Sequence, residues 1–291
     1  MSTNNRTGRK RDYVGVLSSV FAIVIGLLVG FVILLICNPS QALPGFVTIL
    51  TGAFTHGLKG VGQVFYYATP IILTGLSVGF AFKTGLFNIG TPGQFIVGAF
   101  AAVYVGIMWT GLGRIQWAVA LLAAILGGAL WGMVPGFLKA CFNVNEVIAS
   151  IMMNYIGMYM VNWIVKSYKP LFNNLRNESR NVAATAQIPK MGMDKLFPES
   201  SVGGGILLAI AAVLIIWVIL NKTTFGYELK AVGFNRDASR YAGINEKRNI
   251  IMSMVIAGAI AGMAGGLLYL AGTGKHIEIK DVLASEGFTG I

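Results

Sequence analysis

The residues best suited to recognition chemistry in this 291-residue chain are uncharged amides that stand beside glycines. The segment at 83–94 reads KTGLFNIGTPGQ and contains Asn88 and Gln94. An amide side chain donates and accepts hydrogen bonds without carrying a charge. The three glycines and Pro92 of this segment predict a tight, irregular backbone that leads into a helix. These residue types suit contact with an uncharged, hydroxyl-rich solute.

A second polar patch, NVNEVI at 143–148, precedes an apolar run that contains Asn154. Asn145 is suited to cap the following helix, and Glu146 would lie at the positive end of its dipole. Capping is one interpretation of this patch. The other is that Asn145, Glu146 and Asn154 join Asn88 and Gln94 along a solute pathway or gate, and the sequence leaves both open.

A third segment, at 226–244, predicts a short helix of about two turns. Asn235 is suited to its N-cap, Asp237 lies near its start, and Arg240 lies towards its end. Gly243 suits the position just after the C-cap, where a left-handed backbone is common. A groove on a soluble partner could hold such a helix, and a lipid surface would suit it equally well.

Motifs for catalysis and metal binding are missing from the sequence. There is no Walker A sequence, so we expect no ATP hydrolysis by this chain. His56 and His276 lie far apart in loops and are interpreted as solvated, so we predict no catalytic residue, no metal site and no bound cofactor. No ionisable residue interrupts the apolar runs, which argues against proton-coupled transport but leaves a sodium site of neutral groups open.

The composition indicates which elements must position these residues. Hydrophobic residues make up 55% of the chain and charged residues only 11%, whereas a soluble domain carries about 25% charged residues. The formal net charge is +11, but the basic residues lie in short loops between apolar runs. Anionic lipid headgroups explain that charge better than nucleic acid, which we do not expect as a partner. The chain is therefore predicted to be an integral membrane protein.

Seven apolar runs are long enough, at about 18 residues or more, to cross the hydrocarbon of a bilayer. They lie at 14–37, 63–82, 92–110, 116–138, 147–165, 203–220 and 251–272. We predict an all-α, polytopic transmembrane bundle over 14–291, preceded by a cytoplasmic tail at 1–13. The basic residues before the first run, together with the basic loop at 221–249, place the N-terminus in the cytoplasm; those before the run are Arg6, Arg9, Lys10 and Arg11.

Small residues at every fourth position predict close helix packing. The glycines concerned are Gly128, Gly132 and Gly136, then Gly258, Gly262 and Gly266, and finally Gly75 and Gly79. Static packing is one interpretation of these faces, and sliding during gating is the other. The loop at 166–201 is expected outside, either over the mouth of a pathway or simply solvated. The tail at 273–291 is too polar to span, and we expect the natural chain to continue past Ile291.

Four segments together resemble the permease subunits of ABC importers. They are the loop at 226–244 with its AVGxN and AGI elements, the small-residue stretch AGAIAGMAGG at 257–266, FNIGxxGQ at 87–94 and NEVIASIMMNY at 145–155. The likeness runs from about residue 63 to the end of the sequence. It points to the branch that serves simple sugars, nucleosides and branched-chain amino acids, and it is strongest for the nucleoside members.

The resemblance implies a role as a transport subunit in a bacterial plasma membrane. A partner ATPase would use ATP and Mg and would dock under the short helix at 235–243, here called the coupling helix; its contact residues would be Gly233, Asn235, Arg236, Asp237, Arg240, Gly243 and Ile244. A second permease chain and an external substrate-binding lipoprotein would complete the assembly. Family members continue past residue 291 with further apolar helices, which this sequence does not contain.

Nucleosides are the first expectation for the solute. Ribose, galactose or another simple sugar is the second, and branched-chain amino acids are the third because an ionic substrate would favour a charged partner. An ion-coupled secondary transporter, a channel and a purely structural membrane subunit are the alternatives of other classes.

Overall fold

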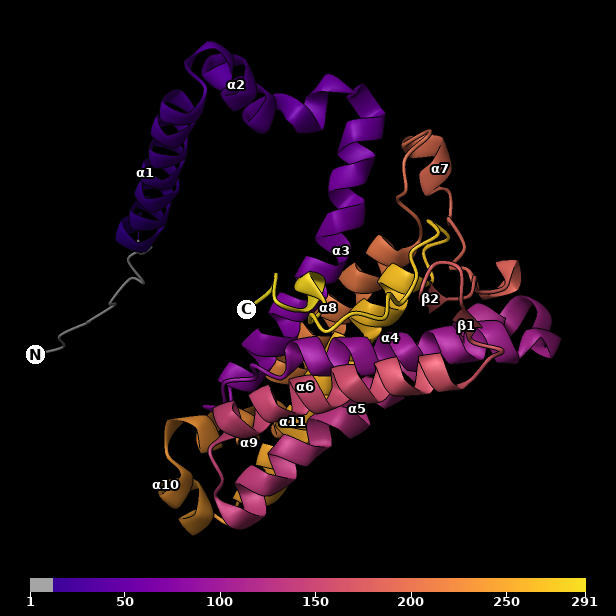
Figure 1. Cartoon of the computed structure of the whole chain (residues 1–291). Helices are drawn as coiled ribbons and strands as arrows, with labels where there is room; N and C mark the ends of the chain where they lie inside the picture. Colours follow the sequence, from indigo (N-terminus) through magenta and orange to yellow (C-terminus); the bar gives the residue numbers. More distant parts are fainter. Residues whose placement is uncertain (1–12) are drawn as a thin grey trace, which may run out of the picture. The chain divides into compact units, whose positions relative to one another are not determined.

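The computed structural model describes residues 13–291, so the tail predicted at 1–13 lies almost entirely outside the described residues (Figure 1). The chain divides into two compact units at Gly60 and Val61. The division falls in the first turn of a helix that begins at Gly57.

The first unit contains two helices, α1 (Tyr13–Cys37) and α2 (Pro39–Thr55). They pack against each other, with the ring centroids of Phe31 and Phe46 4.8 Å apart. Helix α2 was not predicted from the sequence, because its glycines and two prolines are typical of loops. Pro39 occupies the start of α2, where a missing N–H costs nothing. Pro44 lies near the same end, so most of the helix keeps its hydrogen bonds.

The structure confirms the prediction of an all-α bundle with seven candidate membrane spans. The six that follow α1 are α3 (Gly57–Phe82), α4 (Thr91–Met108), α5 (Gln116–Phe142), α6 (Glu146–Ser167), α8 (Gly205–Lys222) and α11 (Glu246–Tyr269). A short 3-10 turn at Thr110–Ile115 precedes α5. The predicted bounds differ from these by a few residues at most ends, because several helices continue beyond the uncharged runs into charged residues such as Lys59, Lys139 and Glu246.

Helices α4, α5 and α11 form the centre of the second unit, where backbones approach very closely. A Cβ atom added at Gly128 of α5 would lie 2.2 Å from the carbonyl oxygen of Gly258 in α11. A Cβ added at Gly98 of α4 would lie 2.4 Å from Cα of Gly262. Three helices therefore meet at glycines. By contrast, space around Gly79 is open, and Gly75 faces the C-terminal tail.

The outward face of α5 presents apolar side chains that a bilayer would cover. Helix α5 buries Ala120 and Ala124 on one face, while Leu122, Leu126 and Leu130 are exposed on the other. Apolar residues around most of the circumference are typical of helices that pack on protein at one side and on lipid at the other.

The long connection between α6 and α8 packs with the C-terminal tail at one end of the second unit (Figure 1). It contains a hairpin of two strands with two residues each, β1 (Phe172–Asn173) and β2 (Glu178–Ser179), and the one-turn helix α7 (Met193–Leu196). The Ser179 N–H donates to the carbonyl of Ile277 at 2.9 Å, and the Ile277 N–H donates to the Ser179 hydroxyl at 3.0 Å. The two short helices α9 (Thr224–Phe234) and α10 (Arg236–Tyr241) lie at the other end (Figure 1).

The tail then folds back into the bundle as an irregular segment. A Cβ at Gly287 would lie 2.5 Å from Cα of Pro92, at the start of α4. A Cβ at Gly290 would lie 2.1 Å from the backbone nitrogen of Gly75, within α3. Irregular backbone inside a membrane protein is tolerated when surrounding protein or a polar cavity provides hydrogen-bond partners for its N–H and C=O groups. The tail therefore packs against α3 and the start of α4 through Gly287 and Gly290, while most of its other residues stay exposed or half-buried.

Candidate functional site

Asn88 and Gln94 form a buried pair that exchanges two hydrogen bonds. Nδ2 of Asn88 donates to Oε1 of Gln94 at 2.9 Å, and Nε2 of Gln94 donates to Oδ1 of Asn88 at 3.0 Å. Nδ2 of Asn88 also lies 3.3 Å from the hydroxyl of Ser77, which donates to the carbonyl of Ala257 at 2.7 Å. The pair thus links α3, α4 and α11.

Asn154 of α6 joins this cluster from the opposite side. Its Oδ1 accepts the Gly93 N–H at 2.8 Å, and its Nδ2 donates to the carbonyl of Ile89 at 3.0 Å. The helix backbone passes so near that a Cβ at Gly93 would lie 2.8 Å from Cα of Asn154. One turn earlier, the buried Ser150 hydroxyl has no hydrogen-bond partner in the part of the chain that the structure describes.

The structure therefore brings together three of the amides singled out from the sequence. In this conformation the three amide side chains form hydrogen bonds with one another or with the backbone; they are Asn88, Gln94 and Asn154. They hold the irregular segment between α3 and α4 in place. Contact between these amides and a solute would require some of those hydrogen bonds to open.

Asn145 and Glu146 lie apart from this cluster, at the start of α6. Oδ1 of Asn145 accepts the N–H groups of Val147 and Ile148 at 2.9 and 3.3 Å, so Asn145 caps the helix. Glu146 pairs with Lys139 of α5 at 2.8 Å. Asn154 is eight residues further along α6, or about 12 Å at 1.5 Å per residue. The structure does not place these two residues beside the amide cluster.

The predicted coupling helix is present as α10, and both of its ends have the expected caps. Oδ1 of Asn235 accepts the Ala238 N–H at 3.0 Å. Gly243 has φ +81, and its N–H donates to the carbonyl of Arg240 at 3.0 Å. The next N–H, of Ile244, donates to the carbonyl of Ser239, which completes a Schellman motif.

The surface around α10 is rich in exposed side chains. Phe234 and Tyr241, which flank the helix, are 91% and 94% exposed. Asp237 and Arg240 are exposed as well, and Arg236 is half-buried and close enough to Glu146 to interact with it electrostatically. Aromatic side chains that face water with a mixed charge rim are typical of a protein-binding surface.

A direct backbone contact connects α9 and α10 to the segment that carries Asn88. A Cβ at Gly233 would lie 2.3 Å from the carbonyl oxygen of Lys83, and Gly85 faces Gly233 in return. Nearby, Leu86 and Val232 belong to one buried apolar cluster. Because these backbones are in direct contact, a displacement of α10 would also displace the irregular segment at 83–90.

A polar cavity of about 230 Å³ lies between α4, α6, the end of α11 and the folded-back tail. Its lining residues are Ile96, Met158, Asn162, Tyr269, Lys275, His276, Glu278, Lys280, Val282, Leu283, Ala284, Ser285 and Glu286. None of them was among the sequence candidates. The interpretation of His276 as a solvated loop residue is wrong, because the side chain is half-buried in this cavity.

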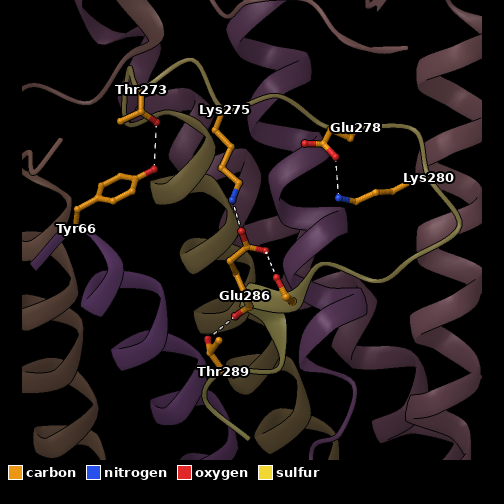
Figure 2. A network of polar contacts seen from close by, with 8 residues as sticks. Tyr66, Thr273, Lys275, Glu278, Lys280, Glu286 and Thr289 are labelled. Atoms are coloured by element: carbon orange, nitrogen blue, oxygen red, sulfur yellow. Dashed lines mark hydrogen bonds and ion pairs between the residues drawn. The ribbon is translucent and has the colours of Figure 1, made fainter. Parts of the chain in front are cut away.

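Two ion pairs organise the tail around the cavity (Figure 2). Lys275 pairs with Glu286, and Lys280 pairs with Glu278 at 2.7 Å. Burial alone would raise the pKa of Glu286, but its hydrogen bond to Lys275, the positive charge there and hydrogen bonds from its own surroundings outweigh burial. The net effect holds the pKa of Glu286 below its ordinary value, so the carboxylate stays ionised at neutral pH.

Comparison with known proteins identifies the family of this fold. Residues 60–291 match the model of a family described as the branched-chain amino acid transport system / permease component. The chain belongs to this permease family. It is therefore a multi-pass membrane protein and a transport subunit. No solved structure matches the chain.

Three relatives show how the similarity is distributed. A guanosine ABC transporter permease of Bacillus subtilis is 41% identical over 94% of this chain and 76% of its own length. A nucleoside ABC transporter permease of Lactococcus lactis is 34% identical over 99% of this chain and 78% of its own length. A glucose ABC transporter permease of Haloferax volcanii is 31% identical over 84% of this chain and 64% of its own length.

Proposed function

We propose that this chain is the membrane-spanning permease subunit of an ATP-driven ABC importer that moves nucleosides inward. The observation that carries the proposal is the 41% identity with a guanosine permease over nearly the whole chain. The nucleoside permease at 34% identity supports the same solute class. Within the bundle, the buried groups near the centre are neutral amides and hydroxyls, which suit an uncharged solute.

The coupling helix α10 is the proposed docking site for the ATPase. In this arrangement α10 and the N-terminus face the cytoplasm, and the contact residues are Gly233, Asn235, Arg236, Asp237, Arg240, Gly243 and Ile244. The exposed Phe234 and Tyr241 add aromatic surface to that contact. ATP and Mg belong to the ATPase, and this chain binds no cofactor of its own.

Transport follows from a shift between two conformers of the bundle. ATP binding to the partner favours the conformer in which α10 has moved, since a ligand shifts an equilibrium by its differential affinity for the two states. The contact between Gly233 and Lys83 carries that movement to the segment at 83–90. The amides Asn88, Gln94 and Asn154 then exchange their mutual hydrogen bonds for others as the pathway opens.

The remaining partners complete the importer. A second, related permease chain would lie beside this one in the bacterial plasma membrane, surrounded by lipid. An extracellular substrate-binding lipoprotein would deliver the solute to the end of the bundle that carries the loop between α6 and α8.

Uptake measurements test the proposed solute and the energy source together. Cells with the gene and deletion cells are given radiolabelled guanosine, uridine and adenosine. The competitors are unlabelled nucleosides, ribose, glucose and leucine. We expect uptake that is lost on deletion, falls when cellular ATP is depleted and is competed by nucleosides alone. Uptake that survives ATP depletion but follows an ion gradient would contradict the ABC mechanism.

A simple sugar is the second candidate solute, favoured by the likeness to a glucose permease at 31% identity. Nucleosides and sugars share hydroxyl groups but differ in the planar base. Loss of glucose, galactose or ribose uptake in the deletion strain, with nucleoside uptake unchanged, would select the sugar.

A further inference from the structure

The cavity under the C-terminal tail has two chemically different sides. Ile96 of α4 and Met158 of α6 form an apolar wall, and both are nearly fully buried. The ring of Tyr269, which is 7% exposed, closes the cavity at the end of α11. The tail supplies the polar side with Lys275 and Glu286, which are shown in Figure 2, and with His276. A ligand with one flat apolar face and one polar edge would match both sides.

The charged residues of this cavity neutralise one another. Lys275 and Glu286 form one ion pair, and Lys280 and Glu278 form the other. With two lysines and two glutamates, the cavity has no net charge apart from His276. A phosphate or a carboxylate would find no unpaired lysine there, so the charge balance favours an uncharged ligand.

Three polar groups at the cavity have unused hydrogen-bonding capacity. Both the Tyr269 hydroxyl and the His276 imidazole line the cavity and make no hydrogen bond with another side chain or backbone group of residues 13–291. Asn162 donates its Nδ2 to the carbonyl of Lys280 at 2.9 Å, which leaves its Oδ1 without a partner among the same residues. Partly buried polar groups normally find partners in protein, water or ligand. Together they offer both donors and acceptors.

The position of the cavity agrees with the direction of import. Tyr269 ends α11, while α10 lies just before the start of the same helix. The 24 residues of α11 correspond to about 36 Å at 1.5 Å per residue. With α10 at the cytoplasmic face, the tail and its cavity lie towards the side from which an importer receives solute.

From this geometry we infer that the cavity binds one uncharged nucleoside on its way through the bundle. The base lies against Ile96, Met158 and the Tyr269 ring, and the ribose hydroxyls bond with His276, Asn162 and the Tyr269 hydroxyl. The volume of about 230 Å³ lies just below the usual range for small-molecule sites, roughly 300–1,000 Å³, and so suits one small molecule. This inference rests on the proposed function and adds a site to it.

Transport kinetics of the complete importer in cells test the site. Tyr269→Phe removes only the hydroxyl, and His276→Ala removes the imidazole. Each is expected to raise the KM for guanosine by about tenfold, the effect of one lost hydrogen bond of some 1.4 kcal/mol. The His276 variant should also discriminate less between guanosine and 2′-deoxyguanosine, because it loses a contact with the ribose. Tyr159→Phe and His56→Ala, both at exposed residues that do not line the cavity, are the matched controls.

A chemical protection experiment measures occupancy without relying on transport. Ser285→Cys, in a chain with Cys37→Ser and Cys141→Ser, places a thiol at the cavity in the assembled transporter. Guanosine is expected to slow its reaction with a small maleimide, whereas Leu175→Cys, at a residue 96% exposed and outside the cavity, should react at an unchanged rate.

The outcomes separate this inference from the proposed function. A wild-type importer that takes up no nucleoside would overturn the proposed function and, with it, the ligand assigned to the cavity. An importer that takes up guanosine with unchanged KM in both variants, and with no protection of the thiol at position 285, would overturn the cavity site alone.

Discussion

At the scale of single residues, the second unit relies on buried polar side chains whose partners come from distant parts of the chain. Asn154 satisfies the Gly93 N–H and the carbonyl of Ile89 at once. Removal of one partner leaves the other buried and unsatisfied, which costs more than the hydrogen bond itself contributes.

Asn154→Ala is expected to lower the free energy of unfolding by about 2–3 kcal/mol, because it leaves two backbone groups without partners. Thermal unfolding of the purified protein in detergent measures this effect. Asn174→Ala, at an exposed loop position, is the control and should change stability little. Equal melting temperatures for the two variants would show that Asn154 is not required to hold the segment before α4.

The ion pair of the tail gives stability a defined pH dependence. The pKa of Glu286 is below its ordinary value of 4.5 in the folded protein. Its contribution is therefore present above the unfolded value and is lost as pH falls through the lower folded value. Glu286→Gln should be less stable than wild type by about 1 kcal/mol at pH 7 and indistinguishable from it in strong acid. Unfolding measured from pH 7 to pH 3 tests this, and a difference that grows in acid would contradict it.

At the scale of elements, contacts between glycines set how near the central helices can come. Gly128→Leu would push a side chain into the carbonyl of Gly258, only 2.2 Å from an ideal Cβ. We expect the free energy of unfolding to fall by at least about 3 kcal/mol. This exceeds the usual cost of overpacking because the obstacle is backbone. Gly79→Leu is the matched control, since nothing lies within 4 Å of a Cβ there. The yield and melting temperature of the monodisperse protein measure both variants, and similar values for the two would contradict the close packing of α5 on α11.

The elements also show which features a sequence can predict. Long apolar runs gave the spans, because a helix that crosses a bilayer needs little beyond length and hydrophobicity. The caps of α10 were predictable since capping is local. Helix α2 was not, because Pro39 and Pro44 resemble loop residues unless their exact place in the helix is known.

The candidate site was predictable only in part, because its geometry depends on long-range packing. The sequence shows Asn88 and Asn154 as amides in apolar surroundings. Their shared role in holding the segment before α4 depends on the packing of α6 on α4, which the sequence does not show. The cavity under the tail involves residues from the tail and from three helices, and the lining residues of different helices are 62 to 173 positions apart in the chain. A signal was present in the alternating charges of the tail, just after the last apolar run: Lys275, Glu278, Lys280, Asp281 and Glu286.

At the scale of the whole molecule, the second unit carries different chemistry at its two ends. One end bears α10 with its exposed aromatic residues, and the other bears the tail, the hairpin and the polar cavity. Helix α11 connects the two ends and packs against α5 and α4 along glycines. An importer needs such a division, because energy arrives from a partner at one face and solute from the other.

The docking of the ATPase can be tested at two exposed aromatic residues, Phe234 at the end of α9 and Tyr241 at the end of α10. Phe234→Ala together with Tyr241→Ala removes two side chains more than 90% exposed, so folding should be unchanged. Exposed aromatic residues often dominate the binding energy of an interface, and their truncation costs about 2 kcal/mol or more each. We therefore expect the ATPase to be lost from the purified transporter while the melting temperature of the permease stays constant.

Tyr227→Ala, at an exposed position of α9, controls for the loss of a surface aromatic ring. If the double variant retained its ATPase as the control does, the partner would have to bind elsewhere, and the backbone contact of Gly233 with Lys83 would lose its role in transmission.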